Sequence, residues 1–148
     1  EAMWRILQQE TPEDFVIATG VTTRVRDFIK MAFAQVGLHL RFEGEGVDEV
    51  GILDYVEEGL YQKTTGNEVL VPTLKVNQVI VKIDPNYFRP TEVDLLIGDP
   101  TKSKTKLGWV PQYNLGTLVE EMMVEDVKIF QRDILLEKGG HMVARPTE

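Results

Sequence analysis

The sequence contains no cysteine, and no apolar run approaches the roughly 20 residues that a membrane-spanning helix needs. The absence of cysteine excludes disulfides and thiolate metal ligands and is compatible with a reducing cytosol. The first residues, Glu1-Ala2-Met3-Trp4, lack the basic and then apolar regions of an export signal. We therefore expect a cytoplasmic protein with no membrane partner.

Positive charge is also scarce, because 16 lysines and arginines face 24 aspartates and glutamates, for a net charge of −8. The basic residues form no long stripe, and most of the surface would repel a nucleic-acid backbone. We expect no nucleic-acid partner. A small anion is not excluded, since one or two arginines at the start of a helix can hold a diphosphate whatever the net charge.

Patterns typical of metal sites and carboxylate catalysis are missing as well. His39 and His141 are far apart in sequence and have no acidic residues at metal-ligand spacing, so we expect no metal. The acids between residues 48 and 58, Glu49 among them, have the pattern of a solvated surface rather than of a catalytic dyad.

The first part of the chain predicts two helices and two strands. Residues 1–9 are typical of the last turns of a helix, and because no N-cap precedes them we expect the segment to be cut from something longer. A short buried strand is predicted over residues 15–18, a helix capped by Thr22 or Thr23 up to Val36, and a half-buried strand over residues 38–42. This strand-helix-strand order favours a mixed or parallel sheet.

The rest of the chain predicts one strand, two helices and a surface excursion. Residues 47–74 lack sustained periodicity and are expected to form a variable surface excursion. A strand over residues 79–83 precedes a turn at Asp84-Pro85-Asn86, and Asp99-Pro100 begins a short helix. A long helix over residues 115–131 is expected to bury Leu115, Leu118, Val119, Met122, Val127 and Phe130. We expect one domain over residues 1–137 and a polar tail over residues 138–148.

Two short segments could hold a nucleotide. Gly44-Glu45-Gly46 begins like a dinucleotide fingerprint, but Glu49 occupies the place of the third glycine and no helix pattern follows, so we reject that interpretation. The second segment is Arg89-Pro90-Thr91-Glu92, in which the proline favours the start of a helix. There Arg89 could donate hydrogen bonds to two phosphate oxygens, and Glu92 could accept hydrogen bonds from sugar hydroxyls. From spacing alone, a local surface ion pair is the commoner explanation.

Several segments together are more specific than any one of them. They are Glu1-Ala2-Met3-Trp4 with Leu7-Gln8-Gln9, Phe15-Val16-Ile17-Ala18-Thr19-Gly20, Arg41-Phe42-Glu43-Gly44, Tyr87-Phe88-Arg89-Pro90-Thr91-Glu92-Val93, Gly98-Asp99-Pro100-Thr101-Lys102 and Leu107-Gly108-Trp109-Val110-Pro111. In this order and spacing they resemble GDP-mannose 4,6-dehydratases, a family of extended short-chain dehydrogenases. The resemblance covers nearly the whole chain and is weakest over residues 47–74 and in the tail.

The resemblance implies an α/β fold: the C-terminal substrate-binding part of such an enzyme, with a small mixed sheet and helices. The N-terminal Rossmann domain, which binds NADP in the family, would be a partner outside this chain, and the intact enzyme would be a homo-oligomer. The family equivalents of Arg89 and Glu92 bind the nucleotide of GDP or GDP-mannose. Tyr87 and Arg26 are further candidates for the same ligand.

The family reaction converts GDP-mannose to GDP-4-keto-6-deoxymannose. It oxidises the sugar at C4 with NADP, removes water across C5 and C6, and returns hydride to C6. The resemblance places the catalytic Thr, Glu and Tyr/Lys pair in the N-terminal domain. None of them maps onto this chain, whose four tyrosines all lack a lysine four residues later.

We therefore expect this chain to hold no catalytic and no cofactor-binding residue, and to bind no NADP alone. It would be the substrate-binding portion of a lyase. The alternatives are a non-catalytic GDP-sugar-binding module and a structural partner of a separate Rossmann subunit.

Overall fold

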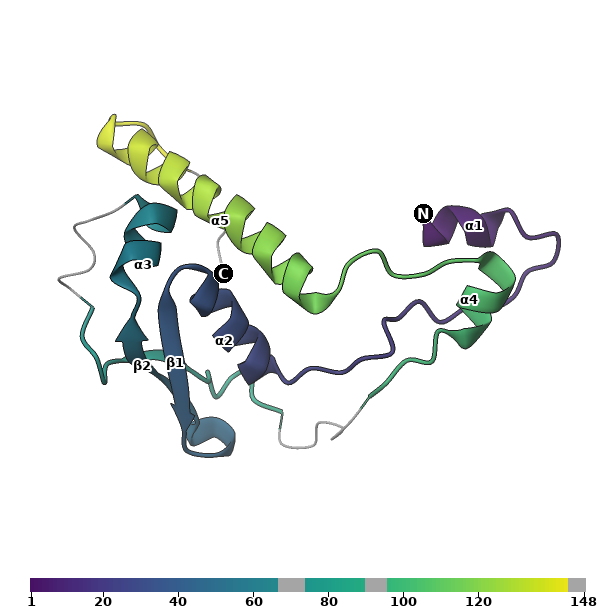
Figure 1. Cartoon of the computed structure of the whole chain (residues 1–148), viewed down its shortest axis with the longest axis horizontal. Helices are drawn as coiled ribbons and strands as arrows, with labels where there is room; N and C mark the ends of the chain where they lie inside the picture. Colours follow the sequence, from purple (N-terminus) through teal and green to yellow (C-terminus); the bar gives the residue numbers. More distant parts are fainter. Residues whose placement is uncertain (67–73, 90–95, 144–148) are drawn as a thin grey trace. The chain divides into compact units, whose positions relative to one another are not determined.

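The computed structural model describes residues 1–66, 74–89 and 96–143 of the 148-residue chain (Figure 1). The chain divides into two compact units. The first comprises Glu1–Arg24 and Arg89–Leu115, and the second comprises Val25–Phe88 and Gly116–Glu148. The single domain expected over residues 1–137, with its polar tail, stays a prediction.

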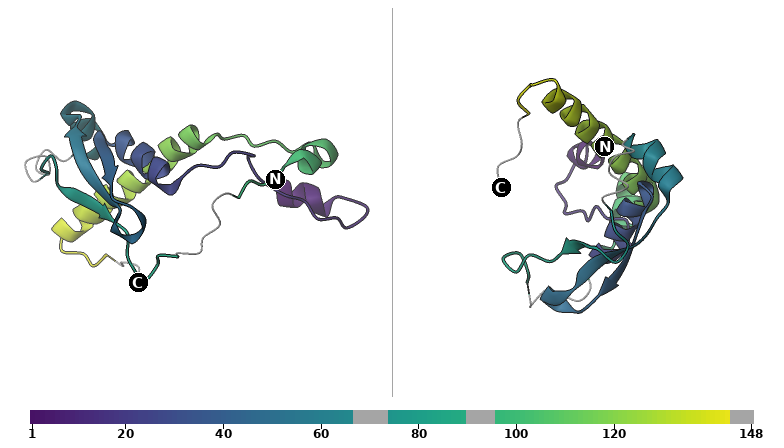
Figure 2. Two further views of the ribbon diagram at one scale, coloured as in Figure 1. Left: turned by 90° about the horizontal axis from the view of Figure 1, so that it is seen from below. Right: turned by 90° about the vertical axis from the view of Figure 1, so that its left-hand side faces the viewer.

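The second unit contains an antiparallel sheet with strand order β1-β2-β3, formed by Leu38–Glu43, Val50–Val56 and Val79–Lys82. Figure 2 shows β1 and β2 as the two arms of a hairpin. The predicted strands at 38–42 and 79–83 are confirmed, but the mixed or parallel sheet is wrong for the described strands. Residues 44–49 join β1 to β2 directly, and this connection is too short for a parallel crossover.

The expected surface excursion over residues 47–74 is also wrong in its first half. Val50–Val56 is β2, the central strand of the sheet, and Glu58–Thr65 is helix α3. Gly51, Ile52 and Leu53 are buried in succession, so the strand lacks the alternating pattern that reveals a strand with one exposed face. The apolar residues of β2 are few and stand between glycines and acids, so the sequence pattern does not indicate a strand there.

The core of this unit lies between the sheet and its helices. Val36, Leu38, Leu40, Leu53 and Tyr61 form its buried centre. Helix α2, Val25–Gln35, adds Ile29 and Phe33, and helix α5, Leu115–Lys138, adds Met123 and Val127. Both helices were predicted, although α5 extends to Lys138. No helix in the described part of the chain is long and apolar enough to cross a membrane.

The inward face of α5 agrees with the predicted one at Val119 and Val127 and differs from it at three other positions. Val119 is completely buried, and Met123 and Val127 follow it at intervals of four residues, so they share one face of the helix. Leu118, Met122 and Phe130 are exposed by 42%, 44% and 68%. Periodicity identified the helix, but two adjacent apolar stripes left its rotation ambiguous.

The first unit contains helix α1, Ala2–Leu7, and helix α4, Thr101–Leu107. Arg5 of α1 donates through Nη1 to the carbonyl of Leu107, at 2.8 Å. The expected strand over residues 15–18 is wrong, because no strand pairs with it in the described part of this unit. Its Val16 carbonyl instead accepts a hydrogen bond from the buried hydroxyl of Ser103, and the ammonium of Lys102 lies 4.8 Å from the centre of the Phe15 ring.

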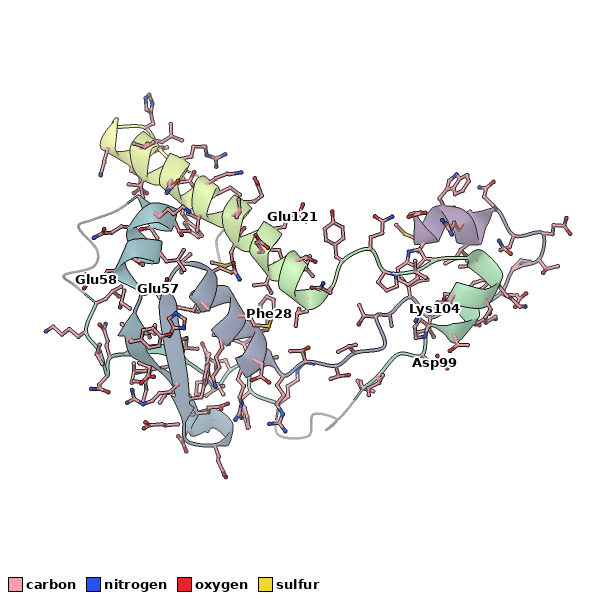
Figure 3. All side chains as sticks on the ribbon, in the orientation of Figure 1. Phe28, Glu57, Glu58, Asp99, Lys104 and Glu121 are labelled. Atoms are coloured by element: carbon pink, nitrogen blue, oxygen red, sulfur yellow. The ribbon has the colours of Figure 1, made fainter. Side chains whose placement is uncertain are left out.

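The start of α4 is held by Asp99 (Figure 3). Its Oδ1 accepts from the backbone N–H of Thr101 at 2.9 Å and also from the Thr101 hydroxyl. These hydrogen bonds, and to a smaller extent the charge of Lys104, lower the pKa of Asp99 below its ordinary value. The helix ends at Gly108, whose φ of +61° is the left-handed conformation typical of a helix C-terminus.

Candidate functional site

Arg26 lies in the first turn of α2 and forms an ion pair with Glu49, which directly precedes β2. Arg26 Nη2 is 2.8 Å from Glu49 Oε1. The arginine side chain is 43% exposed, whereas the carboxylate side chain is only 12% exposed. The acid is therefore the enclosed member of the pair, and the guanidinium faces solvent.

The loop over residues 44–49 places Glu49 in this position. Gly44 and Gly46 have φ values of +86° and +60°, in the left-handed region that favours glycine. A Cβ on Gly44 would lie 2.6 Å from the carbonyl oxygen of Asp48. Any residue with a side chain would therefore clash with the backbone at this position. A short 3₁₀ turn, Gly46–Asp48, then leads into β2.

This loop does not fit a dinucleotide, as the sequence indicated. It is followed by a strand rather than by the helix whose N-terminus receives a pyrophosphate. The carboxylate of Glu49, in the place of the third glycine, would also repel phosphate. The glycines serve to close a tight hairpin.

Tyr87 stands in a turn of the same unit. Asp84 starts this turn by accepting from the backbone N–H of Asn86 at 2.8 Å, and the N–H of Tyr87 donates to the Asp84 carbonyl at 3.1 Å. The side chain of Tyr87 is 79% exposed. The ring of the next residue, Phe88, lies against Gly46, 3.7 Å from the position of a Cβ there. The glycine loop thus contacts both Arg26 and the segment that carries Tyr87.

Arg89 is exposed and belongs to the first unit. Glu92 and Pro90 lie outside the described residues. The pairing of Arg89 with Glu92 around a nucleotide therefore stays a prediction. The structure joins Arg26 and Tyr87 within one unit, through the glycine loop.

Sequence reasoning missed Glu49, which it grouped with solvated surface acids. The position of this acid was the available signal, because it follows two glycines and stands directly before an apolar strand. The other acids of that group include Asp54, whose Oδ1 lies 3.2 Å from Arg41 Nη1 at the surface. Hydrogen bonds from Arg41 to Glu43 and to Asp54 raise the pKa of Arg41.

His39 is a strand-face residue, as expected. Its ring stacks on that of Tyr55, its partner on β2, with 4.1 Å between the ring centres. Its Nε2 lies 3.6 Å from Oε2 of Glu57, which stands just before α3 (Figure 3). Within residues 1–66, 74–89 and 96–143, no group of three acidic or histidine side chains is arranged to hold a metal ion.

These features define a small α/β protein with a three-stranded antiparallel sheet and an arginine presented beside a tight glycine hairpin. A family model described as GDP-mannose 4,6 dehydratase matches residues 1–122. The chain belongs to the GDP-mannose 4,6-dehydratase family.

Curated relatives carry the same description. A GDP-mannose 4,6-dehydratase of Vibrio cholerae is 49% identical over 140 residues, which cover 95% of this chain and 35% of that protein. The GDP-mannose 4,6 dehydratase 2 of Caenorhabditis elegans is 45% identical over 133 residues, covering 90% of this chain and 29% of that protein. The human GDP-mannose 4,6 dehydratase is 41% identical over 131 residues, which cover 88% of this chain and 30% of that protein. The chain spans about a third of the length of these relatives.

Proposed function

We propose that this chain is the substrate-binding portion of a GDP-mannose 4,6-dehydratase, a cytoplasmic lyase that converts GDP-mannose to GDP-4-keto-6-deoxymannose. The observation that supports this most strongly is the family match over residues 1–122, which includes the Tyr-Phe-Arg-Pro-x-Glu-Val segment. The relatives named for this activity support it through 41–49% identity over nearly the whole chain.

The proposed site residues have complementary chemistry. Arg89 forks the diphosphate with charge-assisted hydrogen bonds, and Glu92 accepts hydrogen bonds from a pair of sugar hydroxyls. Arg26 and Tyr87 are further proposed contacts to the nucleotide. The exposure of both side chains supports this assignment, because neither is enclosed by its own unit.

The remaining chemistry belongs to the rest of such an enzyme. NADP, bound by an N-terminal Rossmann domain, supplies the hydride acceptor, and the catalytic Thr, Glu and Tyr/Lys pair stand beside it. The intact enzyme is a homo-oligomer in this proposal. Because the chain spans about a third of its relatives, a second candidate is a GDP-sugar-binding module without catalytic activity.

A chimera distinguishes the two candidates. In it, this chain replaces the matching 140-residue segment of the Vibrio cholerae relative, to which it is 49% identical. Conversion of GDP-mannose to the 4-keto product by this chimera, followed by mass spectrometry, supports the proposed function. A folded chimera that binds NADP and GDP but forms no product supports the non-catalytic module. One that binds NADP but not GDP overturns both.

A further inference from the structure

Glu49 is an enclosed acid whose charge is balanced by one arginine. Its Oε1 is buried and makes no hydrogen bond among the residues that the structure describes. The nearby positive charge is Arg26, with Nη2 at 2.8 Å. A carboxylate in such surroundings depends on its partner, since an enclosed charge without a counter-charge is costly.

The pair is asymmetric in a way that favours a ligand on the arginine side. A guanidinium has five N–H donors in a planar fork, and Glu49 engages Arg26 through one terminal nitrogen. The arginine side chain remains 43% exposed. Arg26 also stands in the first turn of α2, where the helix dipole favours anions, although Asp27 in the same turn opposes this in part.

The loop that carries Glu49 has little freedom to move. Gly44 closes on the Asp48 carbonyl, Gly46 lies against Phe88, and the backbone N–H of Glu49 donates to the Gly46 carbonyl at 3.3 Å. On its other side, Glu49 leads directly into the central strand β2. The backbone at Glu49 is thus closely held and its side chain is only 12% exposed, whereas Arg26 has a longer side chain that is 43% exposed.

We propose that Glu49 is a positioning residue for Arg26, and that it orients the guanidinium so that its outer donors meet the diphosphate of the bound nucleotide. This inference rests on the proposed function, because Arg26 is there one of the GDP contacts. Fixing a long side chain before binding reduces the entropy that the ligand must otherwise overcome. Glu49 itself touches no ligand.

The test measures GDP and guanosine affinities by calorimetry, in the 148-residue chain and in the Vibrio cholerae chimera. Glu49→Gln keeps the side-chain shape and removes the charge that holds Arg26. We expect GDP affinity to fall roughly tenfold, whereas guanosine affinity stays the same because guanosine has no phosphate for Arg26 to contact. Glu49→Asp is expected to recover part of the GDP affinity.

Two further variants serve as controls. Glu43→Gln removes the same charge from a nearby exposed acid that pairs with Arg41, at 2.9 Å, and is expected to leave both affinities unchanged. In an Arg26→Ala background, Glu49→Gln is expected to have no additional effect, since its partner is gone. Circular dichroism melts establish that each variant is folded.

The possible failures are distinguishable. If Glu49→Gln leaves GDP affinity unchanged, or weakens GDP and guanosine equally, Glu49 is structural and the inference is overturned while the proposed function stands. Tighter GDP binding would also overturn it, because Glu49 would then compete with the ligand for Arg26. No GDP binding by either unmodified protein would overturn the proposed function and this inference together.

Discussion

Gly44 is the residue on which the β1-β2 hairpin depends most directly. Its φ of +86° is unfavourable for residues with a side chain, and a Cβ there would meet the Asp48 carbonyl at 2.6 Å. The neighbouring atom belongs to the backbone and cannot rotate away. Position 44 therefore requires glycine for two independent reasons, conformation and space.

We expect Gly44→Ala to reduce the free energy of unfolding by about 1–3 kcal/mol, measured by chemical denaturation. Gly59→Ala is the matched control, because Gly59 lies in α3 with open space around it and ordinary backbone angles. Alanine stabilises a helix by up to about 1 kcal/mol relative to glycine, so Gly59→Ala should leave the free energy of unfolding unchanged or increase it. Equal effects of the two substitutions would contradict the structural role of Gly44.

At the scale of single residues, the sequence indicates which residue types could bind a nucleotide, but it does not indicate which of them are buried. The binding roles of Arg26 and Tyr87 stay predictions, and the glycine loop was separated from a dinucleotide fingerprint because no helix pattern follows it. Glu49 was missed because an acid carries no local sign of burial; its enclosure depends on the loop geometry and on α2, which is distant in sequence. The Arg89 and Glu92 pair stays a prediction.

Helix α5 shows how an element can be predicted while its inward face is identified only in part, at Val119 and Val127. The stripe of Val119, Met123 and Val127 contacts the interior, and the adjacent stripe of Leu118 and Met122 faces solvent. Both stripes are apolar, so periodicity alone does not choose between them. The choice is made by tertiary packing against the sheet.

Substitutions to alanine distinguish the two stripes. Val119 is completely buried, and Val119→Ala should cost about 2 kcal/mol through lost burial and a residual cavity. Leu118 is 42% exposed, and Leu118→Ala should cost less than about 1 kcal/mol although it removes more atoms. Urea denaturation of both variants measures the difference. A larger loss at Leu118 would show that the other stripe faces the core.

The start of α4 should be sensitive to acid. The pKa of Asp99 is lower in the folded protein because hydrogen bonds from Thr101 favour its charged form. Its stabilising contribution is thus present above the unfolded-state pKa and is lost as the pH falls through the folded-state pKa. The protection factors of the α4 amides, corrected for the intrinsic pH dependence of exchange, should fall as the pH falls through that window, and Asp99→Asn should remove this fall. An NMR titration of Asp99 at or above the ordinary aspartate value would contradict this account.

Most helices and two of the three strands could be predicted from periodicity and from glycine, proline and aspartate at their ends. The failures have a common cause. The central strand β2 has three consecutive buried residues followed by two exposed ones and so lacks alternation, and residues 15–18 have strand-like composition but no pairing strand in the described part of their unit. In both cases the deciding interactions come from residues distant in sequence.

At the scale of the whole molecule, the first unit exposes many apolar side chains. Trp4, Leu7 and Val21 are exposed by 65%, 79% and 75%. Relatives that are 41–49% identical to this chain over the aligned residues are about three times as long. The chimera therefore tests the proposed function at the full length of such a relative.

The GDP affinity of the Arg89→Ala chimera, measured by calorimetry against the unmodified chimera, tests the central claim most directly. If Arg89 holds the diphosphate, alanine removes charge-assisted hydrogen bonds and should weaken GDP binding by roughly ten- to over a hundredfold, with little change in thermal stability. Glu92→Gln should have a smaller effect, because it retains an acceptor oxygen. GDP affinity that is unchanged by Arg89→Ala would show that this arginine is a surface residue, and would contradict the proposed nucleotide site.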